Sequence, residues 1–287
     1  MENLVLLSDN LLHAWRSLPL GPAERSIAWA LVLGAGLFFC IYLVERVYGA
    51  PRHQYASRSF LHDIAYWFYY RTGLHYFLFL APMSGLKIES VSSLNVQLLA
   101  TLPYALQALL YFVILDFFYY WIHRAQHHFR FLWAFHTTHH SQEQLNCFTS
   151  LRFHPVDHLV QGFLIYPPLL LLGFSESTWM PVVLLGSFKE LVQHSRIPWR
   201  FGTLYPVLVS PVFHSYHHSK DPSHYDKNFA GLLSFWDYLF GTAVIDDRRG
   251  PSRFGLENVV PTTLASTILA PFRLLRDFYG VKATRRQ

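Results

Sequence analysis

Histidine is concentrated in one part of this chain. Thirteen of the 17 histidines lie between positions 123 and 224, and most of them stand in short blocks. A lone histidine in an apolar chain is usually a hydrogen-bonded packing residue. Repeated blocks, in contrast, require a fold that brings many imidazoles together, so their spacing limits what this chain can fold into.

The first block is HRAQHH at residues 123–128. His123 and His127 are four residues apart, so on a helix they share one face and can bind one metal ion. His128 is turned from His127 by about 100° on a helix, so it points elsewhere.

The second and third blocks share the pattern H-x-x-H-H. Their histidines are His136, His139 and His140 in the second block and His214, His217 and His218 in the third. In each block the first histidine pairs with the other two at helical spacing, and the adjacent pair points in different directions. One helical turn can therefore offer ligands to two neighbouring ions.

These blocks supply eight imidazoles, which are too many for one ion and suit two. Imidazole nitrogen binds zinc, iron, copper or nickel, so the donor type leaves the metal open. The chain has no H-E-x-x-H, which argues against a zincin protease, and no E-x-x-H, which argues against a ferritin-like carboxylate site. The sequence predicts a two-metal histidine site.

Composition places this site in a membrane protein. The chain is 52% hydrophobic and 14% charged, whereas soluble domains have about 25% charged residues. The net charge of +5 comes from scattered basic residues, which gives no support to nucleic-acid binding. We expect membrane segments at residues 27–44, 64–81 and 98–122. We also expect a hairpin with arms at 159–174 and 179–192, the first arm broken by Pro167 and Pro168.

The distribution of charge predicts the orientation of these segments. Arg46, Arg52 and Arg58 follow the first segment, which favours a cytoplasmic loop there. If the remaining segments form two hairpins, all the histidine blocks reach that same side. The predicted fold is an all-α integral membrane protein with about four membrane helices or hairpin arms and a cytoplasmic helical cap that carries the di-metal site.

The motifs resemble those of the fatty acid hydroxylase and sterol desaturase superfamily of integral-membrane di-iron enzymes. The resemblance rests on DFFYYWIHRAQH at 116–127, LWAFHTTHHS at 132–141 and HSYHH at 214–218. It extends to the closing stretch DKNFAGLLSFWDYLFGT at 226–242. It implies a catalytic domain at 108–245 with the inserted hairpin 159–192, preceded by a membrane-anchoring region at 1–107. Residues 246–287 then form an interfacial segment with a basic tail.

The resemblance also implies the ligands of the two irons. They are His123, His127, His136, His139, His140, His214, His217 and His218, together with His194, which matches an extra histidine between the second and third blocks. In members with a longer first spacing His128 would replace His127. Glu190 matches the position of a further ligand in some members, as a ligand or as a group behind the ligands.

Further residues near the motifs are expected to support the site. We expect His154 and His158 to form hydrogen bonds behind the ligands more readily than to bind metal. His224 is expected to pair with Asp226 or to line the entrance. The family's closing N-Y-G reads Asn228-Phe-Ala in this chain, with Ala230 in place of the glycine, which questions the tight glycine turn. The acids expected to orient ligand imidazoles through the outer N–H are Asp116, Asp157 and Asp237.

The implied function is O₂-dependent oxidation of an unactivated C–H bond in a lipid. Hydroxylation of a fatty acyl chain, sterol or related lipid is favoured on the resemblance, and desaturation is the alternative. A more distant alternative is a non-catalytic membrane protein that binds metal. The blocks lie at the ends of membrane segments rather than deep within them, which disfavours a transport pathway.

Electrons for such a reaction must come from another protein. The chain has no G-x-G-x-x-G fingerprint and no iron–sulfur cysteine motif. A separate haem cytochrome, or a ferredoxin with its reductase, is therefore expected to dock on the cytoplasmic side near Arg124, Arg130 or Lys220. The end of the chain carries no lysine-type retrieval signal, which favours a bacterial inner membrane over the endoplasmic reticulum membrane.

Overall fold

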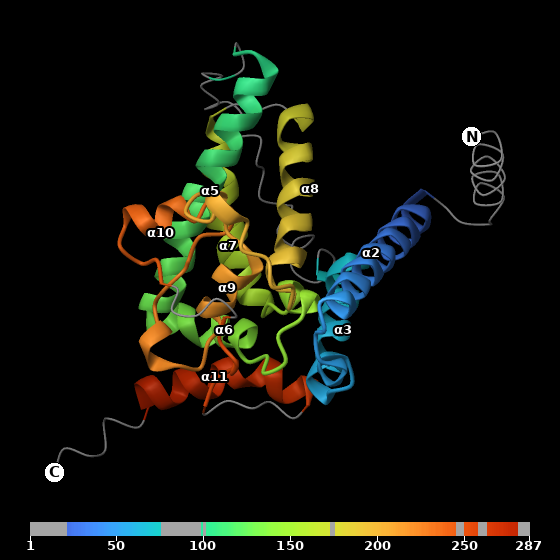
Figure 1. Cartoon of the computed structure of the whole chain (residues 1–287), viewed down its shortest axis with the longest axis vertical. Coiled ribbons are helices and arrows are strands. Elements are labelled where there is room, and N and C mark those ends of the chain that lie inside the picture. The colour runs from blue at the N-terminus through green and yellow to red at the C-terminus, as the bar shows by residue number, and fades with distance from the viewer. Residues whose placement is uncertain are drawn as a thin grey trace.

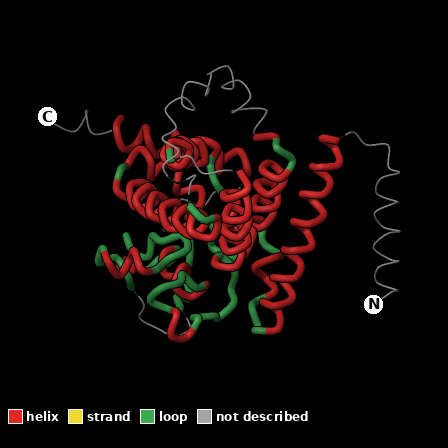
Figure 2. Tube along the Cα trace, turned by 90° about the horizontal axis from the view of Figure 1, so that it is seen from above, coloured by secondary structure: helices red, strands yellow, loops and turns green. Residues whose placement is uncertain are grey.

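The structure is a computed structural model, and it describes residues 22–75, 99, 102–172, 176–244, 250–257 and 263–280. The regular structure of these residues is helical, with one isolated bridge between Ser219 and Phe254 (Figure 2). The longer helices are α2 (Pro22–Val47), α3 (Arg58–Arg71), α5 (Tyr104–His128), α6 (Arg130–His140), α7 (Pro155–Leu171), α8 (Glu176–Gln193) and α11 (Leu264–Gly280). The shorter ones are α9 (Pro211–His217), α10 (Phe235–Leu239) and the 3₁₀ turns η1 (Arg52–Tyr55), η4 (Cys147–Leu151), η5 (Gly202–Leu204) and η6 (Pro222–His224).

Helices α5, α7 and α8 form an upright bundle, and α11 lies across its lower end (Figure 1). The bundle is held by apolar packing between Tyr111 and Ile122 of α5, Ile165 of α7 and Val182 of α8. Helix α6 turns back at Phe129 and packs against both α5 and α11. The lower end of the bundle is therefore where the histidine-bearing ends of α5 and α6 meet.

Helices α2 and α3 pack beside the bundle through the η4 turn. Phe38 of α2 stacks on Phe148 with ring centroids 3.8 Å apart. The fully buried Arg152 donates to Asp63 of α3 at 2.6 Å and to the Thr138 carbonyl of α6 at 3.1 Å. Because both ions are paired and further hydrogen-bonded, this buried salt bridge can be accommodated, and it fixes α3 against α6.

The closing stretch of the sequence motif forms a loop that packs against α5. Asp116 accepts the backbone N–H groups of Leu232 and Leu233, both at 2.7 Å, and the indole N–H of Trp236 at 3.1 Å. A Cβ at Gly231 would lie 2.8 Å from the Tyr119 ring. Only glycine permits this close approach, which brings the loop to the histidine end of α5.

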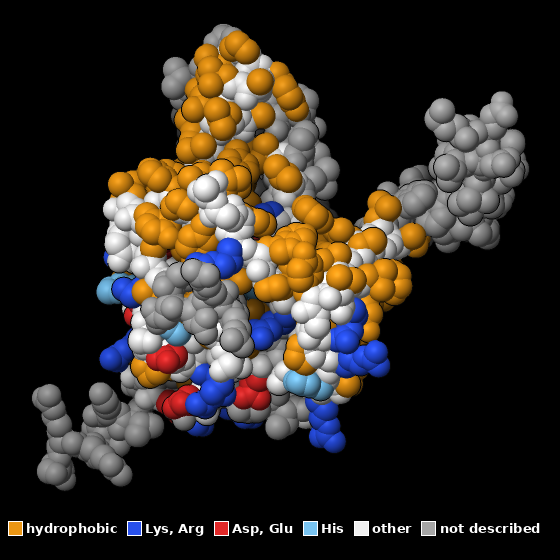
Figure 3. Space-filling view, viewed as in Figure 1, with side chains coloured by type: hydrophobic (Ala, Val, Ile, Leu, Met, Phe, Trp, Pro, Cys, Tyr) orange, Lys and Arg blue, Asp and Glu red, His pale blue; other side chains and the backbone are white. Residues whose placement is uncertain are grey.

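The polarity of the surface changes along the bundle. Figure 3 shows hydrophobic side chains gathered over the upper part, around α5, and charged side chains gathered in the lower half. Among the described residues, α5 is the one helix that is long and apolar enough to cross a membrane by length and composition. The expected count of about four crossings and the cytoplasmic position of the lower half stay predictions.

Several predicted segments differ in their bounds from the observed helices. The segment predicted at 98–122 is α5, which continues to His128, so the first histidine block is the last turn of this helix. The predicted segment 27–44 lies within α2. The hairpin arms are α7 and α8, and α7 continues through positions 167 and 168, where a break was expected. Neighbouring helices can compensate for prolines within a helix, and α7 packs on α5.

The outer predictions fall partly outside the described residues. Helix α3 covers the start of the segment predicted at 64–81, and residues 76–81 are outside the described part of the chain. The apolar segment of the C-terminal region is α11. The basic tail at 282–286 lies outside the described residues.

Candidate metal centre

Four elements carry the histidines to one place. His123 and His127 lie on the last turns of α5, and the second block is the last turn of α6. The third block is the end of α9, whose N-cap Ser210 accepts the backbone N–H of Phe213. His194 directly follows α8. The local helical spacing predicted for each block is therefore realised, and packing of the helix ends brings the blocks together.

The imidazoles form two adjacent groups. In each group the ligand atoms lie within 4.8 Å of one another. The five-histidine group contains His123, His127, His136, His140 and His217, and the four-histidine group contains His139, His194, His214 and His218. The adjacent residues of the second and third blocks thus belong to different groups, as expected for side chains that point about 100° apart on a helix.

In the five-histidine group, the Nε2 atoms of His123 and His136 face each other at hydrogen-bond distance. His123 Nδ1 lies 2.7 Å from the Phe229 carbonyl, and His136 Nδ1 lies 3.0 Å from Asp157 Oδ2. Both acceptors lack hydrogen, so each Nδ1 donates, and in the neutral imidazole each Nε2 then carries a lone pair. The two Nε2 atoms are nevertheless only 3.1 Å apart. A shared cation removes this conflict.

The four-histidine group has the same geometry. His194 Nδ1 donates to the Glu190 carbonyl at 2.7 Å, which leaves a lone pair on its Nε2. That atom lies 3.0 Å from His214 Nε2 and 3.2 Å from His139 Nε2. Two nitrogens bound to one ion at about 2.1 Å, at right angles, are about 3.0 Å apart. The observed spacings therefore fit a metal ion in each group.

Burial favours the neutral form of most of these imidazoles, which is the form that binds metal. Burial lowers the pKa of His194 and that of His217 to about 3. Burial and the neighbouring imidazoles also lower the pKa well below its ordinary value for His139, His140, His214 and His218. At neutral pH these imidazoles can therefore bind cations without first losing protons.

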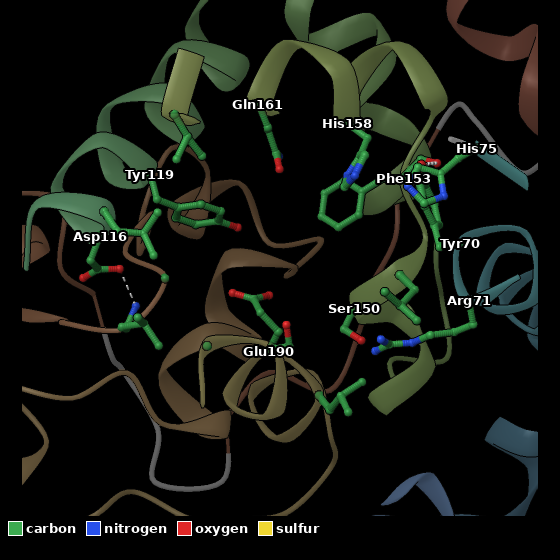
Figure 4. A pocket seen from close by; sticks show the side chains of 18 residues that line it. Tyr70, Arg71, His75, Asp116, Tyr119, Ser150, Phe153, His158, Gln161 and Glu190 are labelled. Carbon is green, nitrogen blue, oxygen red and sulfur yellow. Dashed lines mark hydrogen bonds between the residues drawn. The ribbon is translucent and has the colours of Figure 1, made fainter. Parts of the chain in front are cut away.

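A cavity of about 540 Å³ lies beside the histidine groups, between α3, α5, α7, α8 and η4. Figure 4 shows Tyr119, Gln161, Phe153, Arg71 and Glu190 around it. The Phe153 ring stacks on the His139 ring with centroids 4.4 Å apart, and the Tyr119 ring lies 5.4 Å from that of His123. A molecule in the cavity is therefore separated from each histidine group by one aromatic ring.

The three predicted orienting acids behave differently. Asp157 contacts the imidazole of His136, and Gln126 also donates to it. Asp237 accepts the N–H groups of Phe229 and Ala230 at 2.8 and 2.9 Å, so it acts on His123 only through the loop that carries the Phe229 carbonyl. Asp116 contacts no imidazole among the described residues, because the loop N–H groups occupy it.

The remaining supporting residues lie outside both histidine groups. His128 is exposed and packs on Phe129. His154 Nε2 lies 3.2 Å from the Ile268 carbonyl of α11, so it connects α11 to α7. His224 Nδ1 lies 2.8 Å from Ser219 Oγ, and its expected pairing with Asp226 stays a prediction.

His158 and Glu190 line the cavity instead of joining the groups. Glu190 Oε2 is 3.8 Å from His194 Nδ1, which donates to the Glu190 carbonyl. Asn228 has a positive φ of 56° and donates to the carbonyls of Phe213 and Val244. The turn in question is thus made by Asn228 itself, a residue type that tolerates this conformation.

Several residues at the site carried no signal in the sequence. The carbonyls of Phe229 and Lys227, which accept from His123 and His217, are backbone atoms that any residue type supplies. Trp133 packs on His127 and His140 at 4.7 and 5.3 Å. Its position three residues before His136 was the available clue, since residues at that spacing share a helix face.

Comparison with known proteins finds a family that matches the part of the chain that holds these histidines. Residues 108–242 match the family model of the fatty acid hydroxylases. The chain is 36% identical over 131 residues to alkylglycerol monooxygenase of Danio rerio, covering 46% of this chain and 29% of that protein. It is 32% identical over 170 residues to the ornithine lipid hydroxylase OlsE of Rhizobium tropici, covering 59% and 51%.

A third relative is the Delta(7)-sterol-C5(6)-desaturase of Nicotiana tabacum, which is 31% identical over 145 residues and is covered to 51%. The chain thus spans about half or less of the length of these relatives. No solved structure matches the chain at a comparable level of significance.

Proposed function

We propose, on the premise that residues 108–242 form a fatty acid hydroxylase domain, that the protein is a membrane-bound di-iron enzyme that oxidises an unactivated C–H bond of a lipid with O₂. The observation that carries the proposal is the pair of adjacent, buried histidine groups whose Nε2 atoms converge beside a cavity. The relatives' names describe lipid oxidation, by monooxygenation, hydroxylation or desaturation.

The histidines have the role of holding the metals. In this proposal His123, His127, His136, His140 and His217 hold one iron, and His139, His194, His214 and His218 hold the other. Bound irons would supply the reduction of O₂ and the removal of hydrogen from carbon. The choice of iron rests on the family, since imidazole donors alone also suit zinc or copper.

The other residues of the chain orient the ligands and exclude water. Asp157 and the Phe229 and Lys227 carbonyls fix the tautomer of the imidazoles that they accept from. Tyr119 and Phe153 form the wall between the cavity and the histidine groups. A lipid in the cavity would thereby lie beside a site that bulk water does not fill.

Hydroxylation is the favoured reaction. It converts R–H, O₂, two electrons and two protons to R–OH and water, whereas desaturation removes a second hydrogen and leaves an alkene. The relatives include both kinds of enzyme, and two of the three names quoted describe hydroxylation or monooxygenation.

A separate haem cytochrome or ferredoxin is the proposed source of the electrons. The proposed docking face lies around Trp133, a partly buried ring that packs on His127 and His140. Arg130 begins the same helix and is exposed. Lys220, in contrast, is paired with Glu143 at 2.9 Å, which makes it a weaker candidate for this face. We place this face on the cytoplasmic side, in a bacterial inner membrane in preference to the endoplasmic reticulum.

The test begins with the metal. Protein purified in detergent and reconstituted with iron should contain two irons per chain that react with O₂ after reduction, as measured by elemental analysis and Mössbauer spectroscopy. Lipids from cells with the protein should then contain species heavier by one oxygen atom, or lighter by two hydrogens if the enzyme desaturates. If no stoichiometric metal binds even after reconstitution, the enzyme proposal is wrong.

A zinc-loaded preparation would not decide the question, because such sites can be misloaded during overexpression. Iron reconstitution of the metal-free protein is therefore part of the experiment. If iron binds at two per chain but no lipid changes in mass and O₂ is not consumed, the non-catalytic metal-binding alternative gains support.

A further inference from the structure

The cavity beside the histidine groups has walls of different character. Leu115, Leu151, Ile165, Leu191 and Leu232 supply apolar surface that suits a hydrocarbon chain. Polar groups interrupt this surface on two sides. Figure 4 shows Arg71 and Ser150 on one side and Glu190 and Tyr119 on another. A pure hydrocarbon would leave the guanidinium of Arg71 without an anionic partner among the described residues, at a cost in binding.

Arg71 is the cation of this lining. It ends α3 and is partly buried, and its Nε atom is buried without a hydrogen-bond partner in the described part of the chain. None of the ion pairs found among the described residues involves it. A guanidinium partly withdrawn from water is stabilised by an anion, and no anion pairs with this one among the described residues.

A second buried arginine shows what a satisfied one is like in this protein. Arg152 pairs with Asp63 at 2.6 Å and donates to the carbonyls of Thr138 and Ser59 and to the hydroxyl of Ser141. Those contacts explain Arg152 as a structural residue. Within the described part of the chain Arg71 has no comparable set of contacts, and it lines a cavity instead.

The acids of the cavity do not neutralise Arg71. The Asp116 carboxylate accepts two backbone N–H groups and an indole N–H from the closing loop. Glu190 lies beside Lys189 on α8, and this lysine interacts electrostatically with both acids. These two acids therefore have their own cation on the α5 and α8 side. Arg71, on the α3 side, has no counter-ion among the residues that the structure describes.

We propose that the cavity binds a lipid that carries an anionic oxygen group, a carboxylate or a phosphate, and that Arg71 is the specificity-determining residue that pairs with it. The guanidinium would bind such a group through charge-assisted hydrogen bonds. The apolar lining takes the hydrocarbon part. The inference rests on the proposed function, and it assigns the substrate to charged lipids rather than to uncharged ether lipids or sterols.

The test compares probes with the same hydrocarbon chain and different headgroups. Binding of hexadecyl phosphate, hexadecanoate and 1-O-hexadecylglycerol to the iron-loaded protein is measured in phosphatidylcholine nanodiscs, by displacement of radiolabelled hexadecyl phosphate. The wild type should bind at least one anionic probe about tenfold or more tightly than the uncharged ether, as a hydrogen bond to a charged group is worth on the order of 10- to 100-fold. Whichever of the two anionic probes binds more tightly shows whether the site prefers phosphate or carboxylate.

Two substitutions locate the effect. R71Q should remove most of the preference for the anionic probe while leaving binding of the ether within about twofold, and R71K should keep part of the preference because it keeps the charge. R58Q is the matched control, since Arg58 begins the same helix and is exposed. It should leave the preference unchanged. Iron content and gel filtration establish that each variant is folded.

The outcomes separate this inference from the proposed function. Equal binding of charged and uncharged probes by the wild type would overturn the inference, and so would a folded R71Q that keeps the preference. The wild-type comparison decides the question even if R71Q does not fold. Oxygen consumption and product mass are measured in parallel. Selective binding without oxidation of any probe would sink the proposed function alone, and equal oxidation of the ether would sink the headgroup assignment alone.

Discussion

The two histidine groups differ in what lies behind their imidazoles. In the five-histidine group, the Nδ1 atoms of His123, His136 and His217 each face an oxygen acceptor. In the four-histidine group, only His194 has such an acceptor. The Nδ1 atoms of His139, His214 and His218 are buried without a hydrogen-bond partner among the described residues.

The difference indicates different degrees of preorganisation. An acceptor behind the ring fixes its tautomer and orientation and makes the imidazole a better donor to metal. The five-histidine group is therefore built before its ion arrives. The four-histidine group depends on packing, such as the stack of Phe153 on His139, and on the ion itself. We expect the first group to bind its metal more tightly than the second.

The largest expected effect comes from removing a ligand of either group. H136A and H139A should each reduce the iron content to about one per chain. Each should also lower the oxidation rate by more than 100-fold, since loss of even an outer partner costs about 10- to 100-fold. The retained iron should differ between the two variants in its Mössbauer spectrum, because each variant keeps a different group.

H128A is the control for these variants. His128 is exposed and lies outside both groups, so its removal should leave iron content and rate unchanged. An H128A variant that loses iron, together with an H127A variant that keeps it, would contradict the assignment of the first block.

The next effect concerns the acceptor behind His136. D157N replaces a buried carboxylate that accepts from His136 Nδ1 at 3.0 Å, and it should weaken iron binding to the five-histidine group by about 10- to 100-fold. D226N is the matched control. Asp226 lies 3.7 Å from His127 Nδ1 but is 74% exposed, so water screens it and the same substitution should cost less than about threefold.

Iron titration followed by calorimetry measures both variants. If D226N weakens binding as much as D157N, burial is not what makes the acceptor effective. If D157N weakens binding to the four-histidine group instead, the comparison between the groups is wrong.

A smaller effect is expected from chelation of the intact protein. A soluble chelator should remove iron in two phases, and the four-histidine group should lose its iron about tenfold faster, in line with the smaller number of outer acceptors. Spectra recorded after the first phase should match those of H139A. A single phase, or a first phase that matches H136A, would show that the outer acceptors do not control retention.

The sequence predicted the members of these groups but not their partners. Spacing at three and four residues is a local property, so the blocks on α5, α6 and α9 could be found without the fold. The resemblance alone supplied His194, which stands by itself in the sequence. The assignment of His139 and His140 to two different ions followed from their directions on a helix. Which histidines of the other blocks join each of them could not be predicted from spacing.

The residues that support the ligand imidazoles could not be predicted from the sequence, for a physical reason. Asp116, Asp157 and Asp237 are equivalent as acids near the motifs, yet only Asp157 meets an imidazole, because that contact depends on how α7 packs against α5 and α6. The carbonyls behind His123 and His217 are backbone atoms. The cavity is lined by Arg71, Gln161 and Glu190 from three different helices, so no local sequence pattern predicts it.

The smallest expected effect comes from an acid one step further from the metal. Asp237 accepts the N–H groups of Phe229 and Ala230 and the hydroxyl of Thr242, and the carbonyl of Phe229 accepts from His123. D237N replaces one of the two acceptor oxygens with an NH₂ donor, which would face these donor groups. Because the change reaches His123 only through the loop, iron affinity should fall by no more than about fivefold, below the range expected for a direct partner. A larger loss than in D157N would mean that the loop, not the direct acceptor, sets the orientation.

The pH dependence of stability checks that Asp237 acts as a buried carboxylate. Burial raises the pKa of Asp237 to about 6, above its ordinary value. An acid whose pKa is higher in the folded state binds protons more readily when folded, so the wild type gains stability as the pH falls through about 6. D237N lacks this group and gains nothing from it. Between pH 7 and pH 5 the free energy of unfolding of the metal-free wild type should therefore rise by about 1 kcal/mol relative to D237N. Denaturant unfolding in detergent at both pH values measures this difference, and a constant difference would mean that the Asp237 carboxylate stays charged behind its three donors.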